Sequence, residues 1–232
     1  MTRLTSIFLA LLFSTAMLRA DLTMEQQSSD TNQTVFTITM LHSNMMRMEQ
    51  PSNNLVVIAN LTTRDSFTLL TNKTYLRRWG SEVKWEMKEE VKFSHGTNEI
   101  DNPPAGAVDT GKSESVNGYN AEVYTWMGAF GLKETLWVAK SYPNYNAIRN
   151  EIAKLDMFND TGPHRNTQPI LSLLPGMVVK SESEIKGHTV TTTLVSTRLG
   201  ALDTSLFEVP AGYTAWKRPG TENKETNAPP AH

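Results

Sequence analysis

Side chains that commonly bind metal ions are scattered along this sequence. Its five histidines are never within four residues of one another and there is no cysteine, so no zinc-ligand spacing is present. A denser group surrounds His42, where thioethers of the kind that bind Cu(I) come from Met40, Met45, Met46 and Met48. We interpret this group as structural, because Met40 continues an alternating apolar pattern and methionine commonly fills protein cores. The sequence therefore predicts no bound metal and no cofactor.

Signatures of catalysis are also missing. The sequence contains no Gly-x-Ser-x-Gly elbow, no phosphate-binding loop and no His-Glu-x-x-His helix. Glu182 and Glu184 share one face of a predicted strand, but exposed carboxylates are usually solvated, and the paired acids of a glycosidase need a cleft. We therefore predict a protein that is not an enzyme.

Apolar and aromatic side chains are the remaining candidates. Tyr124 and Trp126 lie on one face of a predicted strand whose other face is also apolar, which indicates burial on both sides. An antiparallel sheet of such strands must be covered on each face or curl around a cavity. Each residue could also belong to an ordinary core. The candidate ligand-binding residues are Phe36, Ile38, Met40, Met48, Tyr124, Trp126 and Trp137.

The N-terminus has the pattern of an export signal. A cationic start at Arg3 precedes an apolar run from Leu4 to Met17, and Ala20 is the small residue expected before a cleavage site. The run is too short to span a bilayer, which takes about 20 apolar residues. We predict a signal peptide over residues 1–20. Without a lipidation cysteine, the product is expected to be soluble in the periplasm or outside the cell.

The charge of the chain excludes some partners. The formal net charge is −2, and cleavage of the predicted signal would remove Arg3 and Arg19 and make it more negative. Nucleic acids and anionic lipid headgroups are bound by clustered Lys and Arg, so neither is the expected main partner. Stable insertion into a membrane is not expected either.

Short alternating runs separated by turn residues predict an antiparallel meander in the first part of the mature chain. In the segment 35–41, Phe36, Ile38 and Met40 share one face, while Thr37 and Thr39 share the other, so one face is expected to be dry. The predicted strands are 22–27, 35–41, 45–49, 55–59, 67–70 and 75–77.

Two hairpins and a helix are predicted in the second half. Asn117-Gly118 and Lys186-Gly187 provide the positive φ angles of tight hairpin turns, between 112–116 and 121–127 and between 177–185 and 188–197. A further strand is predicted over 135–139. Ile148, Ile152 and Leu155 give the segment 142–158 a narrow apolar face, which predicts a helix lying on the sheet.

Other segments complete the organisation of the chain. The segment 79–93 fits both a strand and a helix, and we favour the helix. Pro103-Pro104 indicates a loop over 95–107. The polar end, 217–232, is expected to be disordered, which leaves a single domain over 21–216.

Several segments together carry a resemblance to a known family. They are TGKSESVNGYNAEVYTW from Thr110, LWVAKSYPNY from Leu136, VVKSE from Val178, TTTLVS from Thr191 and SLFEVPAGY from Ser205. In this order they resemble domain of unknown function family 4412, over most of the mature chain. Members are exported bacterial proteins that often have a cysteine at the place of Asn120 or Ala121. Its absence here indicates that this cysteine is not a shared functional group.

The resemblance implies a fold and a class of function. The family is similar in architecture to periplasmic lipoprotein carriers of the LolA and LolB type. The implied fold is α+β and mostly β, a curved antiparallel sheet forming an unclosed barrel with one or two covering helices. The implied partner is an apolar, lipid-like molecule or a lipidated protein, held between sheet and helices.

Two other functions stay open at this stage. The protein could be a non-catalytic envelope interaction or structural protein with a fully packed interior, or an uncharacterised enzyme. A binding protein requires an apolar cavity of about 300 Å³ or more, which a packed interior would lack.

Overall fold

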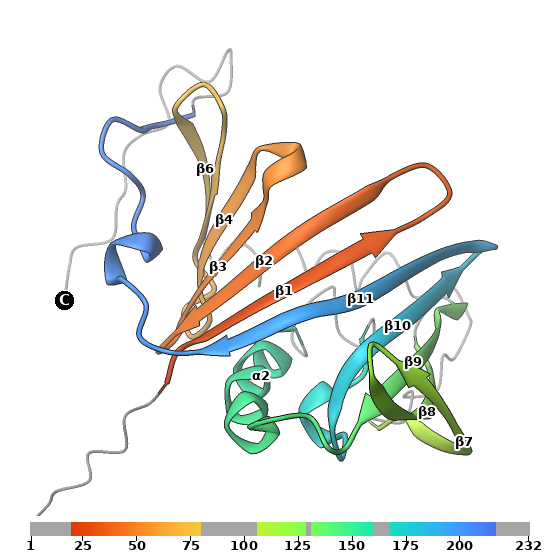
Figure 1. Cartoon of the computed structure of the whole chain (residues 1–232). Coiled ribbons are helices and arrows are strands. Elements are labelled where there is room, and N and C mark those ends of the chain that lie inside the picture. Colours follow the sequence, from red (N-terminus) through yellow and green to blue (C-terminus); the bar gives the residue numbers. More distant parts are fainter. Residues whose placement is uncertain (1–19, 80–105, 129–130, 160–167, 217–232) are drawn as a thin grey trace, which may run out of the picture.

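A computed structural model describes residues 20–79, 106–128, 131–159 and 168–216 (Figure 1). Outside the described residues lie 1–19 of the predicted signal peptide, the segment from residue 80 to 93, most of the predicted 95–107 loop and the tail at 217–232. No helix among the described residues is long and apolar enough to cross a membrane.

The first part of the chain forms a meander of six strands. Each strand pairs antiparallel with the next one in the sequence. This pattern confirms the strands expected from the alternation and the turns. They are β1 (Leu22–Ser29), β2 (Thr34–His42), β3 (Met45–Gln50), β4 (Leu55–Asn60), β5 (Ser66–Leu69) and β6 (Thr74–Arg78).

A second antiparallel meander follows. It consists of β7 (Val108–Val116), β8 (Tyr119–Met127), β9 (Lys133–Ala139), β10 (Met177–Ile185) and β11 (His188–Leu199). At the two predicted hairpin turns, Asn117 and Gly118 have φ angles of 51° and 82°, and Lys186 and Gly187 have 50° and 79°. Both turns therefore use the positive φ that their sequences predicted.

The two meanders join into one curved sheet because β1 pairs antiparallel with β11 (Figure 1). A short parallel strand, β12 (Thr214–Ala215), extends the sheet beyond β6. The sheet ends at β12 on one side and at β7 on the other, so it does not close into a barrel. The predicted α+β, mostly β architecture with a curved, unclosed antiparallel sheet is confirmed.

One α-helix, α2 (Tyr145–Asn159), covers the sheet within the described residues. Its apolar face carries Ile148 and Ile152, which are 1% and 5% exposed and belong to the same buried cluster as Leu22 and Leu41. The helix begins three residues after the predicted start because Asn144 has a φ of 56°, which no residue within a right-handed helix adopts.

The described residues include the short 3-10 helices η1 (Pro51–Asn53), η3 (Leu171–Leu173) and η4 (Thr204–Phe207). The chain around η4 packs on the outer face of the first meander. Arg47 donates a hydrogen bond from Nη1 to the Leu206 carbonyl over 2.8 Å, and the rings of His42 and Phe207 lie 5.5 Å apart. The chain around η4 therefore covers the outer face of β2 and β3 at His42 and Arg47.

The corner that enters β10 has room only for glycine. A Cβ added to Gly176 would lie 2.4 Å from the backbone oxygen of Ala139, at the end of β9. Neither backbone segment can move without disturbing the pairing of Met177 with Ala139. Gly200, which follows β11, has an ordinary φ, and a Cβ added there would have no atom within 4 Å.

We expect Gly176→Ala to lower the free energy of unfolding by about 2 kcal/mol or more, as overpacking against rigid backbone does. Gly200→Ala should change it by no more than about 0.5 kcal/mol, since its methyl group meets open space. Urea denaturation of both variants checks this. Equal effects of the two substitutions would contradict the close approach of Gly176 to the Ala139 backbone.

Candidate functional site

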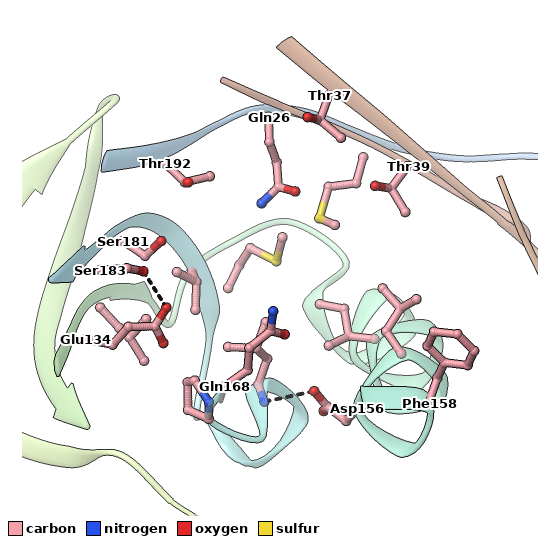
Figure 2. Close-up of a pocket in the computed structure, with 18 of the residues that line it drawn as sticks. Gln26, Thr37, Thr39, Glu134, Asp156, Phe158, Gln168, Ser181, Ser183 and Thr192 are labelled. Carbon is pink, nitrogen blue, oxygen red and sulfur yellow. Dashed lines mark hydrogen bonds between the residues drawn. The ribbon is translucent and has the colours of Figure 1, made fainter. Parts of the chain in front are cut away.

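A cavity of about 460 Å³ lies between the inner face of the sheet and the layer formed by α2 and the segment around η3 (Figure 2). Its wall comes from β1, β2 and β3 of the first meander and from β9, β10 and β11 of the second. Both halves of the sheet are therefore needed to enclose it.

One side of the cavity is rich in methionine. Met24 on β1 and Met48 on β3 are both register partners of Thr39 on β2, so the three side chains share the inner face. Met46 lies further along β3, and Leu155 faces the cavity from α2. We call Met24, Met46 and Met48 the methionine side; it is an apolar surface made of flexible side chains.

The other side is lined by hydroxyl groups and one acid. Ser183 on β10 pairs in register with Glu134 on β9 and donates a hydrogen bond from its hydroxyl to Glu134 Oε1 over 2.7 Å. Ser181 and Thr192 continue the surface onto β11, where the Thr192 and Ser28 hydroxyls are 2.8 Å apart. We call Glu134, Ser181, Ser183 and Thr192 the hydroxyl side (Figure 2).

The negative charge of Glu134, the acid of the hydroxyl side, is only weakly stabilised by neighbouring groups. Burial raises the pKa of the Glu134 carboxyl above its ordinary value, and the hydrogen bond from Ser183 offsets only part of that effect. The charged form of Glu134 is therefore held in the cavity wall at a free-energy cost.

The second acid in the lining, Asp156, has a structural task. Its two carboxylate oxygens accept hydrogen bonds from the backbone N–H groups of Leu171 and Ser172, over 3.1 and 2.8 Å. These bonds hold η3 against the C-terminal part of α2, at the edge of the cavity that Asp156 and Leu171 line (Figure 2). Both carboxylate oxygens of Asp156 are therefore occupied by backbone donors, whereas Glu134 accepts a hydrogen bond from a side chain.

The structure places the first group of candidate residues on different faces of the sheet. Met48 lines the cavity. Phe36, Ile38 and Met40 alternate with the lining residues of β2, so they lie on the outer face. Met40 is the register partner of Arg47, whose guanidinium contacts the Leu206 carbonyl, which places Met40 beneath the C-terminal segment.

The aromatic candidates are also divided. Tyr124 and Trp126 are register partners of Leu136 and Glu134, so they share the inner face and are buried beside the lining rather than in it. Trp137 points the opposite way. Its Nε1 donates to Glu114 Oε2 over 2.9 Å, and Lys180 Nζ lies 4.0 Å from its ring centroid. Trp137 therefore lies on the face of β9 opposite to Leu136 and Glu134, where it is buried.

Sequence reasoning missed the hydroxyl-bearing residues of the inner face. Thr37 and Thr39 line the cavity, although their side of the strand was expected to be the wetter one. Gln26, Ser181 and Glu134 were not singled out either. The available signal was the unusual density of Thr and Ser on strands β10 and β11, which is difficult to distinguish from a solvent-facing surface.

The methionine and histidine group around residue 42 is not one site. Met46 and Met48 face the cavity, whereas Met40 lies on the outer face and His42 is hydrogen-bonded to Asp21 over 3.0 Å. Within the described residues, no group of three or more His, Cys, Asp or Glu side chains could hold a metal ion.

The fold and the cavity define a β-rich protein with a ligand-sized space beneath a curved sheet. The chain belongs to the family described as domain of unknown function (DUF4412), whose sequence profile matches residues 15–213. The resemblance seen in the sequence is thereby confirmed. A search of curated protein sequences finds no match.

Solved structures with a similar fold have little sequence in common with this chain. An uncharacterized conserved protein from Thermus thermophilus is 8% identical, with 87% of this chain and 92% of that chain covered and a TM-score of 0.48. A putative outer membrane lipoprotein-sorting protein domain from Vibrio parahaemolyticus is 11% identical, with coverages of 81% and 89% and a TM-score of 0.34.

PNGF-II is 12% identical over 84% of this chain, with a TM-score of 0.40. This chain covers 30% of the length of PNGF-II. These likenesses concern the fold alone.

Asp156→Ala should lower the free energy of unfolding by about 1–3 kcal/mol, because two backbone donors at η3 lose their acceptor. Asp156→Asn retains one acceptor oxygen and should cost less. Denaturant unfolding measures the loss, and hydrogen exchange at Leu171 and Ser172 locates it. Unchanged exchange at these two amides in Asp156→Ala would show that the carboxylate does not hold η3.

Glu134→Gln should raise stability at about pH 7.5, and the gain should shrink as pH falls through the raised folded-state pKa of Glu134, reaching its minimum below the ordinary glutamate pKa of about 4.3. The folded-state pKa of Glu134 is raised, so the folded protein binds this proton more tightly than the unfolded chain does. Wild-type stability therefore falls as pH rises through the folded pKa, whereas Gln remains neutral and still accepts from Ser183. Thermal melts of both proteins across this range test the sign; a pH-independent difference would contradict it.

Proposed function

We propose that this protein binds an amphiphilic, lipid-like molecule, with its apolar part held between the methionine side of the cavity and α2. The ligand is a free lipid or the acyl chain of a lipidated protein. The observation that carries the proposal is the cavity itself, with apolar side chains contributed by both the sheet and the helix.

The size of the cavity supports a binding role. Small-molecule sites typically occupy about 300–1,000 Å³, and the volume of about 460 Å³ lies within that range. A protein acting only through its outer surface has no need of such a space, because packed interiors contain few voids larger than a water molecule. The alternative of an interaction protein with a filled interior is therefore less favoured.

The chemistry of the lining supports an apolar chain as the guest. Leu155 and Ile152 line the cavity from α2, and Met24, Met46 and Met48 line it from the sheet. Methionine side chains adapt to different shapes and recur at binding surfaces that accept several apolar partners. A flexible hydrocarbon chain matches such a surface better than a rigid polar molecule does.

The same lining favours binding over catalysis. Asp156 is engaged by two backbone N–H groups, and Glu134 is paired with a serine hydroxyl rather than with a second acid or a histidine. An acid–base reaction needs a second group positioned on the substrate. The proposal therefore assigns no chemical step to the cavity.

The predicted signal peptide supports a role outside the cytoplasm. The ligands available there to an exported bacterial protein include envelope lipids and lipidated proteins. Either would present an acyl chain to the cavity.

Two neighbouring positions on β2 test the proposal. Thr37 lines the cavity, and Ile38 lies on the opposite face of the same strand. We expect Thr37→Trp to weaken binding of the neutral apolar dye N-phenyl-1-naphthylamine by about tenfold or more, because the indole occupies the cavity. Ile38→Trp should bind the dye as the wild type does.

Dye fluorescence is measured with excitation outside the tryptophan band, and circular dichroism verifies that both variants are folded. Loss of binding in Ile38→Trp with retention in Thr37→Trp would place the ligand on the outer face, as the alternation of Phe36, Ile38 and Met40 had indicated. Absence of dye binding by the wild type, together with no lipid mass in native mass spectra of protein purified from its own cell envelope, would refute the proposal.

A further inference from the structure

The ionisable side chains that line the cavity have one sign of charge. Within the described residues, the lining contains Glu134 and Asp156 but no lysine, arginine or histidine. Cavities that hold fatty acids or phosphate headgroups normally supply a cationic or multiple N–H donor for the anion. The described lining instead provides carboxylates and no cationic side chain.

Of the two acids, Glu134 is the one with capacity for a further partner. Both oxygens of Asp156 accept from backbone N–H groups. Within the described residues, the Glu134 carboxylate receives one hydrogen bond, at Oε1 from Ser183. Figure 2 shows the Glu134 carboxyl group directed towards the cavity from β9.

The neighbours of Glu134 provide weak, neutral hydrogen-bonding groups. Ser181 and Thr192 contribute hydroxyls, and Gln26 contributes an amide from β1. Hydroxyl and amide oxygens accept hydrogen bonds from an ammonium group as readily as water does, which would replace part of its hydration. They cannot neutralise an anion.

We propose that the cavity selects amphiphiles whose polar end is a protonated amine, with Glu134 as the counter-ion and the hydroxyl side as the remaining shell. This inference rests on the proposed function, because it specifies the head group of the same ligand. The apolar chain extends from the hydroxyl side to the methionine side, and the ammonium group stays at the β9–β10 end.

The energetics of the cavity wall agree with this assignment. Burial raises the pKa of Glu134, which means that its charge is poorly compensated by the protein's own groups. A cation at hydrogen-bond distance would stabilise the carboxylate, whereas an anionic head group would be repelled and would remain desolvated. Glu134 in the cavity wall would therefore favour a cationic head group over an anionic one.

The test compares three probes with the same chain: decylamine, decanol and decanoate. Each displaces N-phenyl-1-naphthylamine from the full-length mature protein near neutral pH at about 0.15 M salt, where distant surface charges are screened. Decylamine should bind about tenfold more tightly than decanoate or better, with decanol between them.

Glu134→Gln should remove most of the difference in affinity between decylamine and decanoate, because the counter-ion is lost. Glu182→Gln is the matched control. Glu182 lies on β10 between Ser181 and Ser183, points to the opposite face and contacts Lys180 Nζ over 2.7 Å. This control makes the same change in net charge and should keep the amine preference.

The outcomes separate this inference from the proposed function. Failure of all three probes and of the dye to bind would refute the proposed function itself. If the wild type binds decanol but shows no preference for decylamine, only the head-group assignment is refuted. This outcome is decided with the wild-type protein alone. An equal loss of preference in Glu182→Gln would assign the selectivity to overall charge and would also refute it.

Two lysolipids identify the source of the amine. A preference for lysophosphatidylethanolamine over lysophosphatidylcholine of the same chain length, which has the same net charge but no N–H donor, would assign the ligand to aminolipids. Equal affinity for both lysolipids, with the decylamine preference retained, would assign it to free long-chain amines.

Discussion

The pairing of β1 with β11 is the interaction on which the rest of this structure depends. Every other antiparallel pair of the described strands joins strands that are consecutive along the chain, and among these α2 and η3 intervene only between β9 and β10. The β1–β11 seam instead joins residues such as Ser28 and Thr192, which are 164 residues apart and share a hydrogen bond over 2.8 Å. A bulge between Glu25 and Gln26 interrupts its register. Such bulges increase local twist and bend a strand, which agrees with the curvature that the sheet needs around a cavity.

The local part of the fold could be predicted from the sequence, because hairpins depend on neighbouring residues. Alternation located the strands, and Asn117-Gly118 and Lys186-Gly187 located two turns to the residue. The seam was not predictable in this way, since no local pattern specifies that β1 lies beside β11. Small boundary differences also had local causes, such as the bulge in β7, where Gly111 has a φ of 71° and the register shifts between Asp109 and Lys112.

The candidate site was predicted less well than the fold, for a physical reason. Alternation shows that the two faces of β2 differ, but it does not show which face encloses a cavity. On the outer face, Met40 is buried beside the chain around Leu206 and Phe207, whereas Phe36 and Ile38 are half-buried. Thr37 and Thr39 are polar although they face inward, because that space is not filled by other side chains. Where a sheet is covered on both sides, the drier face is the packed one and the wetter face can be the binding one.

The cavity spans the β1–β11 seam, so ligand binding is linked to the pairing of these two strands. The methionine side belongs to the first meander, and the hydroxyl side belongs to the second apart from its contact with Ser28. A ligand that spans both sides binds only when β1 and β11 are paired, so it stabilises the paired state by mass action. Glu134 would contribute in the same direction, because a counter-ion removes the cost of its buried charge only in the complete cavity. The protein by itself therefore keeps a poorly compensated acid and a cavity at the junction of its two halves, and a cationic amphiphile would complement both at once.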